Sequence, residues 1–275
     1  LVSCNSVDLA KNKIVYSMIL NTSGGIIDDI TLGFLDGYYY MVVNASNKEK
    51  VLHWVNKWNS FNVKIEDLTL DYGFIAFQGP NAESEMKRIF NLDLSEYKRF
   101  SIFNIPFFDE SCLGFRTGYT GEDGFEFCIP RSVLNRVWDH FSESSVALCG
   151  LAARDSLRIE AGLPLYGQEL SDQINPLMTR YPWVIKFDKE FLGKLSLLEY
   201  KKESVQLTTV GFQMNDRVVA RYGYKILEDS NGRVLSGTLS PYTNKSVGMA
   251  LIGCDKAQEG CDITIEIRGK NYTAT

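Results

Sequence analysis

Histidine is scarce in this sequence, with only two among 275 residues. His53 and His140 both fall within segments that the apolar spacing predicts as helices, and neither has a nucleophilic residue beside it. Ser-His-Asp and Cys-His catalysis need a histidine within hydrogen-bond reach of the nucleophile, so the sequence argues against both. Any acid–base chemistry is therefore expected from carboxylates, tyrosines, lysines or the substrate itself.

The cysteines lack the spacing of a metal site or of a disulfide framework. There are six, with no C-x-x-C pair and none next to a histidine, at positions 4, 112, 128, 149, 254 and 261. This pattern predicts no metal site, because zinc-binding sequences space their ligands in close pairs. It also favours a reducing compartment, in which thiols stay unpaired.

Long apolar runs and clusters of basic residues are also absent from the sequence. No apolar stretch is long enough to cross a bilayer, and a net charge of −5 gives no electrostatic footprint for nucleic acid. We therefore expect neither a membrane nor a nucleic-acid partner. With 45% apolar and 23% charged residues, the composition is that of an ordinary globular protein. A length of 275 residues predicts two or three domains.

The most informative stretch that is present runs from Arg116 to Glu126 and reads RTGYTGEDGFE. Its glycines recur at every third residue, which favours a tight backbone path over a helix or a regular strand. This spacing is not that of a dinucleotide-binding loop. Glu126 lies within the apolar strand that follows, where a carboxylate is costly to bury without a partner. It is either a solvated turn acid or the acceptor of two parallel hydrogen bonds from a guanidine-like edge, such as that of a pterin.

Hydrophobic periodicity predicts an α+β region followed by an all-β region. Strands are expected at 14–20, 26–35, 38–44, 73–78 and 125–129, with a hairpin turn at 21–25. Helices are expected after an N-cap at Ser46, around Met86, Ile89 and Phe90, and at 132–142, 150–163 and 195–203. Beyond these, short strands separated by turn signals predict a small antiparallel barrel or sandwich. We place the boundary so that the domains are 1–203 and 204–275. The first residues read as the middle of a domain, so we expect domain 1–203 to be incomplete at its N-terminus.

The segment 116–126 resembles the signature of the aminomethyltransferase (glycine cleavage T-protein) family, R-x-G-Y-T-G-E-D-G-[FV]-E. Other segments resemble that family in the same order: 23–29 (SGGIIDD), 41–44 (MVVN), 76–82 (AFQGPNA) and 150–167 (GLAARDSLRIEAGLPLYG), with weaker matches at 183–186 and 237–241. The resemblance covers almost the whole chain. It implies two ferredoxin-like α+β lobes and a C-terminal antiparallel β-barrel in a ring, with folate in the central cavity.

The resemblance also implies an activity and its partners. The family transfers a one-carbon unit from aminomethyl-dihydrolipoyl H-protein to tetrahydrofolate and releases ammonia. Tetrahydrofolate, or a modified pterin, is then the expected co-substrate. The expected partners are the lipoyl-bearing H-protein and other components of the glycine cleavage complex. The expected location is the cytoplasm, or the mitochondrial matrix in a eukaryote.

A pair of adjacent acids holds the expected catalytic residue. Asp28 and Asp29 lie on a predicted strand and point to opposite faces, so one can face inward while the other is solvated. Turn chemistry alone would make both of them solvated acids beside a hairpin. The second aspartate of the family's segment lies beside the folate and matches Asp29. The resemblance therefore implies that Asp29 hydrogen-bonds near N10 of the cofactor, orients it and keeps N5 nucleophilic.

Five further residues match positions that line the family's folate cavity. Arg154, on its own an ordinary helix cation, matches an arginine that contacts folate, and its planar fork suits a carboxylate. Glu126 is the acid expected to grip the pterin, and Tyr119 and Asn44 match other cavity residues. Tyr16 matches through a shorter segment, and the alternative for it is a strand aromatic packed on a sheet.

The sequence also departs from the family pattern. Gly33 stands where an aromatic residue is usual. In the segment NPLMTR at 175–180, Met178 and Arg180 replace the acid and the glycine of N-P-x-E-x-G, so we expect a reshaped loop. The upstream family segment D-[LV]-S-H-M-G and a folate-contacting tyrosine near the family's C-terminus have no counterpart here.

Other readings of the same resemblance remain open. Iron–sulfur assembly factors on this fold carry K-G-C-Y-x-G-Q-E, whereas Gly118 stands at the cysteine position here. The folate module of sarcosine or dimethylglycine oxidoreductases is joined to a flavin domain, which has no counterpart in this sequence; a related demethylase is a further alternative. A degenerate relative that only binds partners is motivated by Met178 and Arg180.

Overall fold

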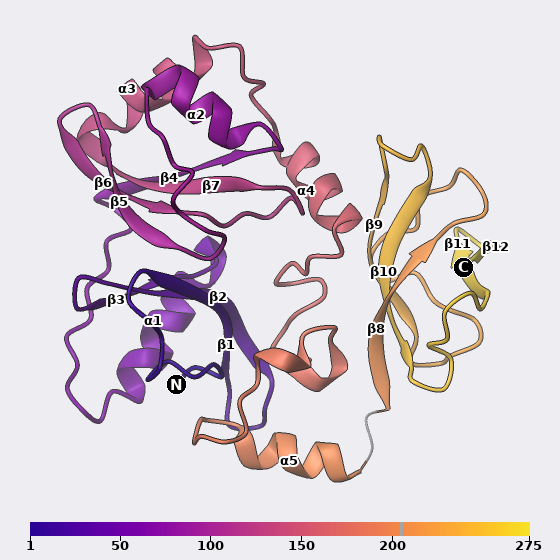
Figure 1. Cartoon of the computed structure of the whole chain (residues 1–275). Coiled ribbons are helices and arrows are strands. Elements are labelled where there is room, and N and C mark those ends of the chain that lie inside the picture. The colour runs from indigo at the N-terminus through magenta and orange to yellow at the C-terminus, as the bar shows by residue number, and fades with distance from the viewer. Residues whose placement is uncertain (204–205) are drawn as a thin grey trace.

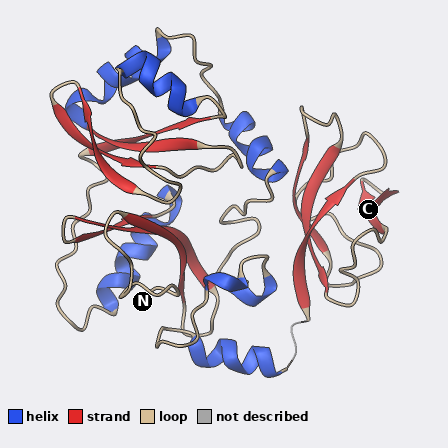
Figure 2. Cartoon of the chain, viewed as in Figure 1, coloured by secondary structure: helices blue, strands red, loops and turns tan. Residues whose placement is uncertain are grey.

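The computed structural model describes residues 1–203 and 206–275. Two α+β units are followed by a connecting region and by a C-terminal β region (Figure 1). The helices and strands of Figure 2 confirm the α+β class and the all-β character of the C-terminal part. The predicted division into 1–203 and 204–275 borders residues 204–205, which lie outside the described residues, and it stays a prediction.

The first unit is a three-stranded antiparallel sheet in the order β1-β2-β3. The strands are β1 (Lys13–Leu20), β2 (Ile26–Leu35) and β3 (Tyr38–Val42). Helix α1 (Lys48–Lys57) packs on one face, where its Val51 joins a buried cluster with Ile19, Ile27, Ile30 and Leu32. The turn between β1 and β2 closes as the sequence predicts, because the side chain of Asn21 accepts the Ser23 and Gly25 amides.

Helix α1 begins later than the sequence predicts. We expect Ser46 to cap it, but residues Ala45–Asn47 form a 3-10 turn and the helix cap is Asn47. The side chain of Asn47 makes no capping hydrogen bond and instead donates to Asp28 on β2 across 2.6 Å. The prediction is wrong because a buried carboxylate competes for this segment, which turn propensities alone do not register.

The second unit is a four-stranded antiparallel sheet in the order β4-β7-β6-β5. The strands are β4 (Tyr72–Gln78), β5 (Ile102–Phe107), β6 (Glu110–Phe115) and β7 (Gly124–Pro130). Helices α2 (Ala82–Phe90) and α3 (Arg131–Ser142) cover one face (Figure 1). The core beneath them is rich in phenylalanine, including Phe103, Phe107, Phe125, Phe127 and Phe141. The opposite face of the sheet is turned toward β1–β3, and Ile14, Leu35, Ile102 and Phe115 form a buried cluster between the two units.

A connecting region joins these units to the C-terminal strands. It contains α4 (Leu151–Glu160), the 3-10 turns Pro176–Met178 and Pro182–Val184, and α5 (Lys194–Lys202). Helix α4 ends three residues before the predicted 163, because Gly162 has a φ of +66° and breaks the helical path. Helix α4 lies beside β9 and β10 (Figure 1). No helix in the part of the chain that the structure describes has the length and apolarity of a membrane span.

The C-terminal region holds a three-stranded antiparallel sheet, β8-β10-β9, and a hairpin of β11 and β12. The strands are β8 (Leu207–Gln213), β9 (Arg233–Leu239), β10 (Ser246–Gly253), β11 (Ile263–Ile267) and β12 (Lys270–Ala274). Isolated bridges from Met214 to Ala274 and from Ile226 to Ile265 tie the hairpin to the sheet around a shared apolar core. Over residues 206–275 the pairing does not run continuously around a closed barrel.

Candidate functional site

Asp29 on β2 is the centre of the candidate site. Its Oδ2 accepts a hydrogen bond from the Tyr16 hydroxyl across 3.0 Å, and its Oδ1 accepts one from Asn44 Nδ2 across 2.8 Å. Burial, together with the nearby charge of Asp28, raises the pKa of Asp29 to about 6, although the hydrogen bonds from Tyr16 and Asn44 lower it in part. A carboxylate that changes charge near neutral pH is suited to proton handling or to orienting an amine.

Asp28 has a different role from its neighbour. It is fully buried and accepts hydrogen bonds from the Asn44 amide, the Asn44 side chain and the Asn47 side chain, at 3.0, 2.8 and 2.6 Å. The two acids occupy adjacent positions on β2, but neither is fully solvated as the pattern allowed. Strand β3 pairs with β2 only as far as Thr31 opposite Val42, and the chain then turns so that Asn44 reaches both carboxylates. Asp28 therefore anchors this turn, and Asn44 orients Asp29.

An aromatic group adjoins Asp29 on the side of Tyr16. The ring of Tyr16 meets Tyr181 edge-on with centroids 5.9 Å apart, and Trp183 lies 6.4 Å from Tyr16. Burial raises the pKa of Tyr16 well above its ordinary value, so its hydroxyl stays a donor to Asp29. Trp183 is 58% exposed, which leaves an apolar ring open beside Tyr16. The sequence analysis missed Tyr181 and assigned no role to Trp183, although the weak family match at 183–186 pointed there.

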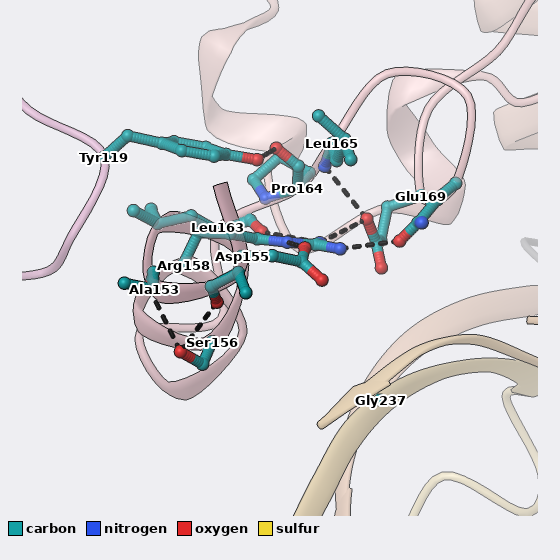
Figure 3. Close-up of polar contacts among 12 residues, drawn as sticks. Tyr119, Ala153, Asp155, Ser156, Arg158, Leu163, Pro164, Leu165, Glu169 and Gly237 are labelled. Carbon is teal, nitrogen blue, oxygen red and sulfur yellow. Dashed lines mark hydrogen bonds and ion pairs between the residues drawn. The ribbon is translucent and has the colours of Figure 1, made fainter. Parts of the chain in front are cut away.

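Tyr119 and Arg154 form a second part of the candidate site. The Tyr119 hydroxyl donates to the Pro164 carbonyl across 2.5 Å, as Figure 3 shows. The Arg154 guanidinium lies 4.7 Å from the centroid of the Tyr119 ring, within the range of a cation–π contact. Arg154 is exposed at the start of α4, so its charge remains open to an anionic group. Burial raises the pKa of Tyr119, and the charge of Asp29 contributes to that rise.

Glu126 lies on β7 between β4 and β6, opposite Ala76 and Phe115. It is half-buried and points away from the phenylalanine core, because its neighbours Phe125 and Phe127 fill that side. Its Oε2 accepts a hydrogen bond from the Thr117 hydroxyl across 2.5 Å. The sequence predicts that this acid needs a partner if it is buried, and Thr117 of the signature segment is that partner. The contact itself was not predicted. The other carboxylate oxygen of Glu126 accepts no hydrogen bond from the described residues and lies on the side of the sheet that faces the first unit.

The signature turn is held in place by its own residues. Arg116 forms ion pairs with Asp123 and Glu83 and has a side chain only 13% exposed, so it stabilises the turn rather than serving a ligand. The amide of Gln78 donates to the carbonyls of Thr117 and Phe125. A Cβ at Gly118 would lie 1.8 Å from Gln78 Oε1, which excludes a side chain there while Gln78 keeps these bonds. The regular glycine spacing therefore reflects close packing as well as the positive φ of Gly121, +82°.

The family departures have physical explanations. A Cβ at Gly33 would meet Ile102 and Ile14 at 3.0 and 3.2 Å, so apolar side chains from both units already fill the space of the missing aromatic ring. Met178 is buried in an apolar cluster with Met18 and Leu20, which explains why an acid is not needed there. Arg180 is exposed and lies against Gly162.

The predicted site residues are thus only partly brought together. Tyr16, Asp29 and Asn44 are in direct contact, and Tyr119 and Arg154 form a second contact pair. Glu126 contacts neither group among the described residues. The surface hollows at 104–111 and around 226–263 contain none of the six residues. The placement of folate in a central cavity therefore stays a prediction.

Comparisons with known proteins agree with one another. Residues 1–189 match the family model described as the GCVT N-terminal domain, and residues 208–275 match the glycine cleavage T-protein C-terminal barrel domain. A protein named aminomethyltransferase from a Thermoanaerobacter species is 40% identical, over 97% of this chain and 76% of that protein. Another from Staphylococcus saprophyticus is 37% identical, over 100% of this chain and 78% of its own length. The crystal structure of glycine cleavage system aminomethyltransferase T from Bartonella henselae superposes with a TM-score of 0.91 at 28% identity, covering 99% of this chain and 77% of that one.

Proposed function

This chain belongs to the glycine cleavage T-protein family of aminomethyltransferases, and we propose that it passes a one-carbon unit from the dihydrolipoyl arm of an H-protein to tetrahydrofolate. In this transfer the carbon–sulfur and carbon–nitrogen bonds of the aminomethyl group break, and the carbon becomes bonded to N5 and N10 of tetrahydrofolate. The two protons released from these nitrogens end on the lipoyl sulfur and on ammonia, so no oxidant or reductant is needed.

The observation that carries the proposal is the environment of Asp29. Its carboxylate is fixed by donors from two sides, Tyr16 and Asn44, and its pKa is raised to about 6 by burial. Such a group can hold an N–H of the bound pterin in one orientation while its proton affinity stays close to that of the medium. Because the acid is already positioned before substrate binds, it contributes mainly through orientation of the reacting amine.

The remaining residues suit the chemistry of a reduced folate. A folate offers a flat ring with N–H donors at one end and carboxylates at the other. Glu126 has a carboxylate oxygen for the donor edge, and the rings of Tyr119, Tyr16 and Trp183 supply apolar surface. The exposed guanidinium of Arg154 suits the terminal carboxylates. When bound, tetrahydrofolate supplies the nucleophilic N5, which no protein side chain replaces.

The expected partners follow from the same proposal. The donor of the aminomethyl group is a lipoyl-bearing carrier, together with the other components of the glycine cleavage complex. The open ring of Trp183 lies beside Tyr16, the hydrogen-bond donor to Asp29, and gives the lipoyl arm an apolar surface at this site. The cytoplasm, or the mitochondrial matrix in a eukaryote, is the proposed location.

The iron–sulfur assembly reading is less well supported than the transferase. Relatives of that class carry a cysteine where this chain has Gly118, and the amide of Gln78 occupies the space that a side chain would need. Gln78 is itself fixed by hydrogen bonds to the Thr117 and Phe125 carbonyls. Close packing against Gln78 therefore explains why glycine stands at position 118 in this chain.

The test is a single-turnover assay with the full-length protein. Aminomethyl-loaded H-protein and tetrahydrofolate are mixed with it, and ammonia and 5,10-methylenetetrahydrofolate are measured together. Equal yields of both products support the proposal. Ammonia without methylenetetrahydrofolate indicates simple hydrolysis of the aminomethyl group, and neither product indicates a folate-binding relative without transferase activity. Free lipoamide in place of H-protein serves as the control for recognition of the carrier.

A further inference from the structure

A buried ion pair that the proposed chemistry does not use connects α4 to the loop after it. Arg158 Nη1 lies 2.7 Å from Glu169 Oε2, and the side chains are 0% and 2% exposed. Burying two charges costs several kcal/mol per ion before their attraction is counted, so such a pair is weak evidence of stabilisation. Stabilisation alone therefore does not explain why Arg158 and Glu169 are buried together at this position.

The pair is bonded to the backbone on both sides of Pro164. Arg158 Nη1 donates to the Leu163 carbonyl across 3.2 Å, and Glu169 Oε2 accepts from the Leu165 amide across 2.9 Å. Figure 3 shows the guanidinium and the carboxylate lying beside this short segment. Proline has no amide hydrogen and a fixed φ, so the direction of the Pro164 carbonyl depends on how its two neighbours are held.

The Pro164 carbonyl is the acceptor for Tyr119. The Tyr119 hydroxyl donates to it across 2.5 Å, and the ring carries Arg154 on one face. The chain of contacts thus runs from the ion pair through residues 163–165 to a tyrosine and an arginine of the candidate site. Both charged groups of the pair are buried, so neither is exposed to a ligand.

We propose that Arg158 and Glu169 are positioning residues, which clamp the Leu163–Leu165 segment so that Pro164 fixes the orientation of Tyr119 against the folate. The proposal rests on the proposed function, because it assumes that Tyr119 contacts the pterin. An ordinary structural ion pair would support the fold as a whole. The clamp instead acts on one side chain, and it does so before any ligand binds.

The chain offers a matched control on the same arginine. Arg158 Nε also donates to Asp155 across 2.9 Å, but the Asp155 side chain is 44% exposed and makes no hydrogen bond to residues 163–165. Asp155→Ala therefore removes a charge partner of Arg158 without removing a bond to the loop. Glu169→Gln is the conservative variant, since the amide oxygen can still accept from Leu165 and Arg158.

The first experiment reads Tyr119 directly and without folate. 3-Fluorotyrosine is placed at position 119 of the full-length protein, and its ¹⁹F resonance is recorded. We expect Glu169→Ala to move the resonance toward that of solvent-exposed tyrosine and to broaden it, Glu169→Gln to restore it, and Asp155→Ala to leave it unchanged. An unchanged resonance in folded Glu169→Ala overturns the proposal. If that variant does not fold, Arg158→Met with Glu169→Leu replaces the charges by apolar groups of similar size and is read in the same way.

The second experiment is a double-mutant cycle on tetrahydrofolate affinity, measured by calorimetry. Tyr119→Phe and Glu169→Ala are each expected to raise Kd about tenfold, the equivalent of one hydrogen bond. The double variant is expected to raise it no further, because both changes remove the same positioned hydroxyl. A hundredfold rise in the double variant would contradict the clamp while leaving the function intact. If Tyr119→Phe alone leaves Kd unchanged, the contact between Tyr119 and folate is contradicted. The ¹⁹F resonance of position 119 would then still test whether Arg158 and Glu169 position Tyr119.

Discussion

The hydroxyl of Tyr16 reaches Oδ2 of Asp29 across 3.0 Å, although the two residues are not direct partners in the sheet. Asp29 pairs with Met18, and Tyr16 pairs with Thr31, so the contact is diagonal and depends on the length of the tyrosine side chain. The bond stabilises the carboxylate and lowers its pKa, whereas burial raises it more strongly. The result, a pKa of about 6, gives this site a pH dependence that can be measured.

Replacing Asp29 by asparagine should lower turnover more than it weakens folate binding. The amide keeps the shape of the side chain but has no negative charge to orient the reacting amine. We expect kcat to fall by about 100-fold, as is usual when a positioned acid–base group is lost, with a change in the folate Kd below about fivefold. Asp36→Asn, at an exposed acid in the turn after β2, is the control and should change neither quantity. Equal losses in kcat and affinity would mean that Asp29 only binds.

The same substitution should stabilise the fold at neutral pH. The folded-state pKa of Asp29 is raised from its ordinary value of 3.8 to about 6, so the folded protein holds a proton that the unfolded chain has lost between these values. Stability therefore falls as pH rises from about 4 to about 6, and the cost is fully present above 6. The shift corresponds to about 3 kcal/mol. Urea unfolding of Asp29→Asn should show a larger free energy of unfolding than the unmodified protein at pH 7.5 and little difference at pH 4. A gain at pH 4 as large as that at pH 7.5 would exclude this explanation.

Glu126→Ala should mainly weaken folate binding. Glu126 is half-buried on β7 and retains a carboxylate oxygen for a ligand after bonding Thr117. Loss of a hydrogen bond to a charged group costs about 1.5–3 kcal/mol, so we expect the folate Kd to rise about 10- to 100-fold by calorimetry. Glu122→Ala is the matched control, because Glu122 is an exposed acid in the same turn. Unchanged affinity in Glu126→Ala would remove this residue from the pterin site.

The sequence predicted those features that depend on local patterns. The antiparallel strand pairs, the glycine-rich turn and the positions of α2 and α3 follow from periodicity and turn residues, and the structure confirms them. Strands β5 and β6 were not predicted, because Pro106 and Gly114 interrupt their patterns, and their pairing in the sheet identifies them as strands. The family resemblance supplied Asp29, but not the environment that raises its pKa.

The long-range contacts of the candidate site could not be predicted from the sequence. Tyr181 and Pro164 lie far along the chain from Tyr16 and Tyr119, and no spacing rule joins them. The bonds of Asn44 were not predicted either. The resemblance implies that Asn44 lies against folate, which stays a prediction, and it gave no sign that the side-chain amide is bonded to both adjacent aspartates. Such contacts depend on how the units pack, which periodicity within one element does not encode.

The two asparagines beside the acid pair give the sharpest test of how Asp29 is tuned. Asn44 donates to Asp29 and Asp28, whereas Asn47 donates only to Asp28. The bond from Asn44 lowers the pKa of Asp29, so its removal should raise that pKa, although burial remains the larger influence. In the unmodified protein we expect kcat to fall as pH drops through about 6, and Asn44→Ala should move this limb to higher pH.

Asn47→Ala should not move the limb in that direction. It removes a bond that holds Asp28 ionised, and a less charged Asp28 repels the charge of Asp29 less, so any change in the pKa of Asp29 is downward. Each substitution leaves a buried carboxylate short of a donor, and both should lower the free energy of unfolding by about 1–3 kcal/mol. The two variants are therefore expected to differ in the pH profile of kcat but not in the free energy of unfolding. If both substitutions shift the acid limb upward together, the limb reports general loosening of the turn after β3 and not the direct bond from Asn44 to Asp29.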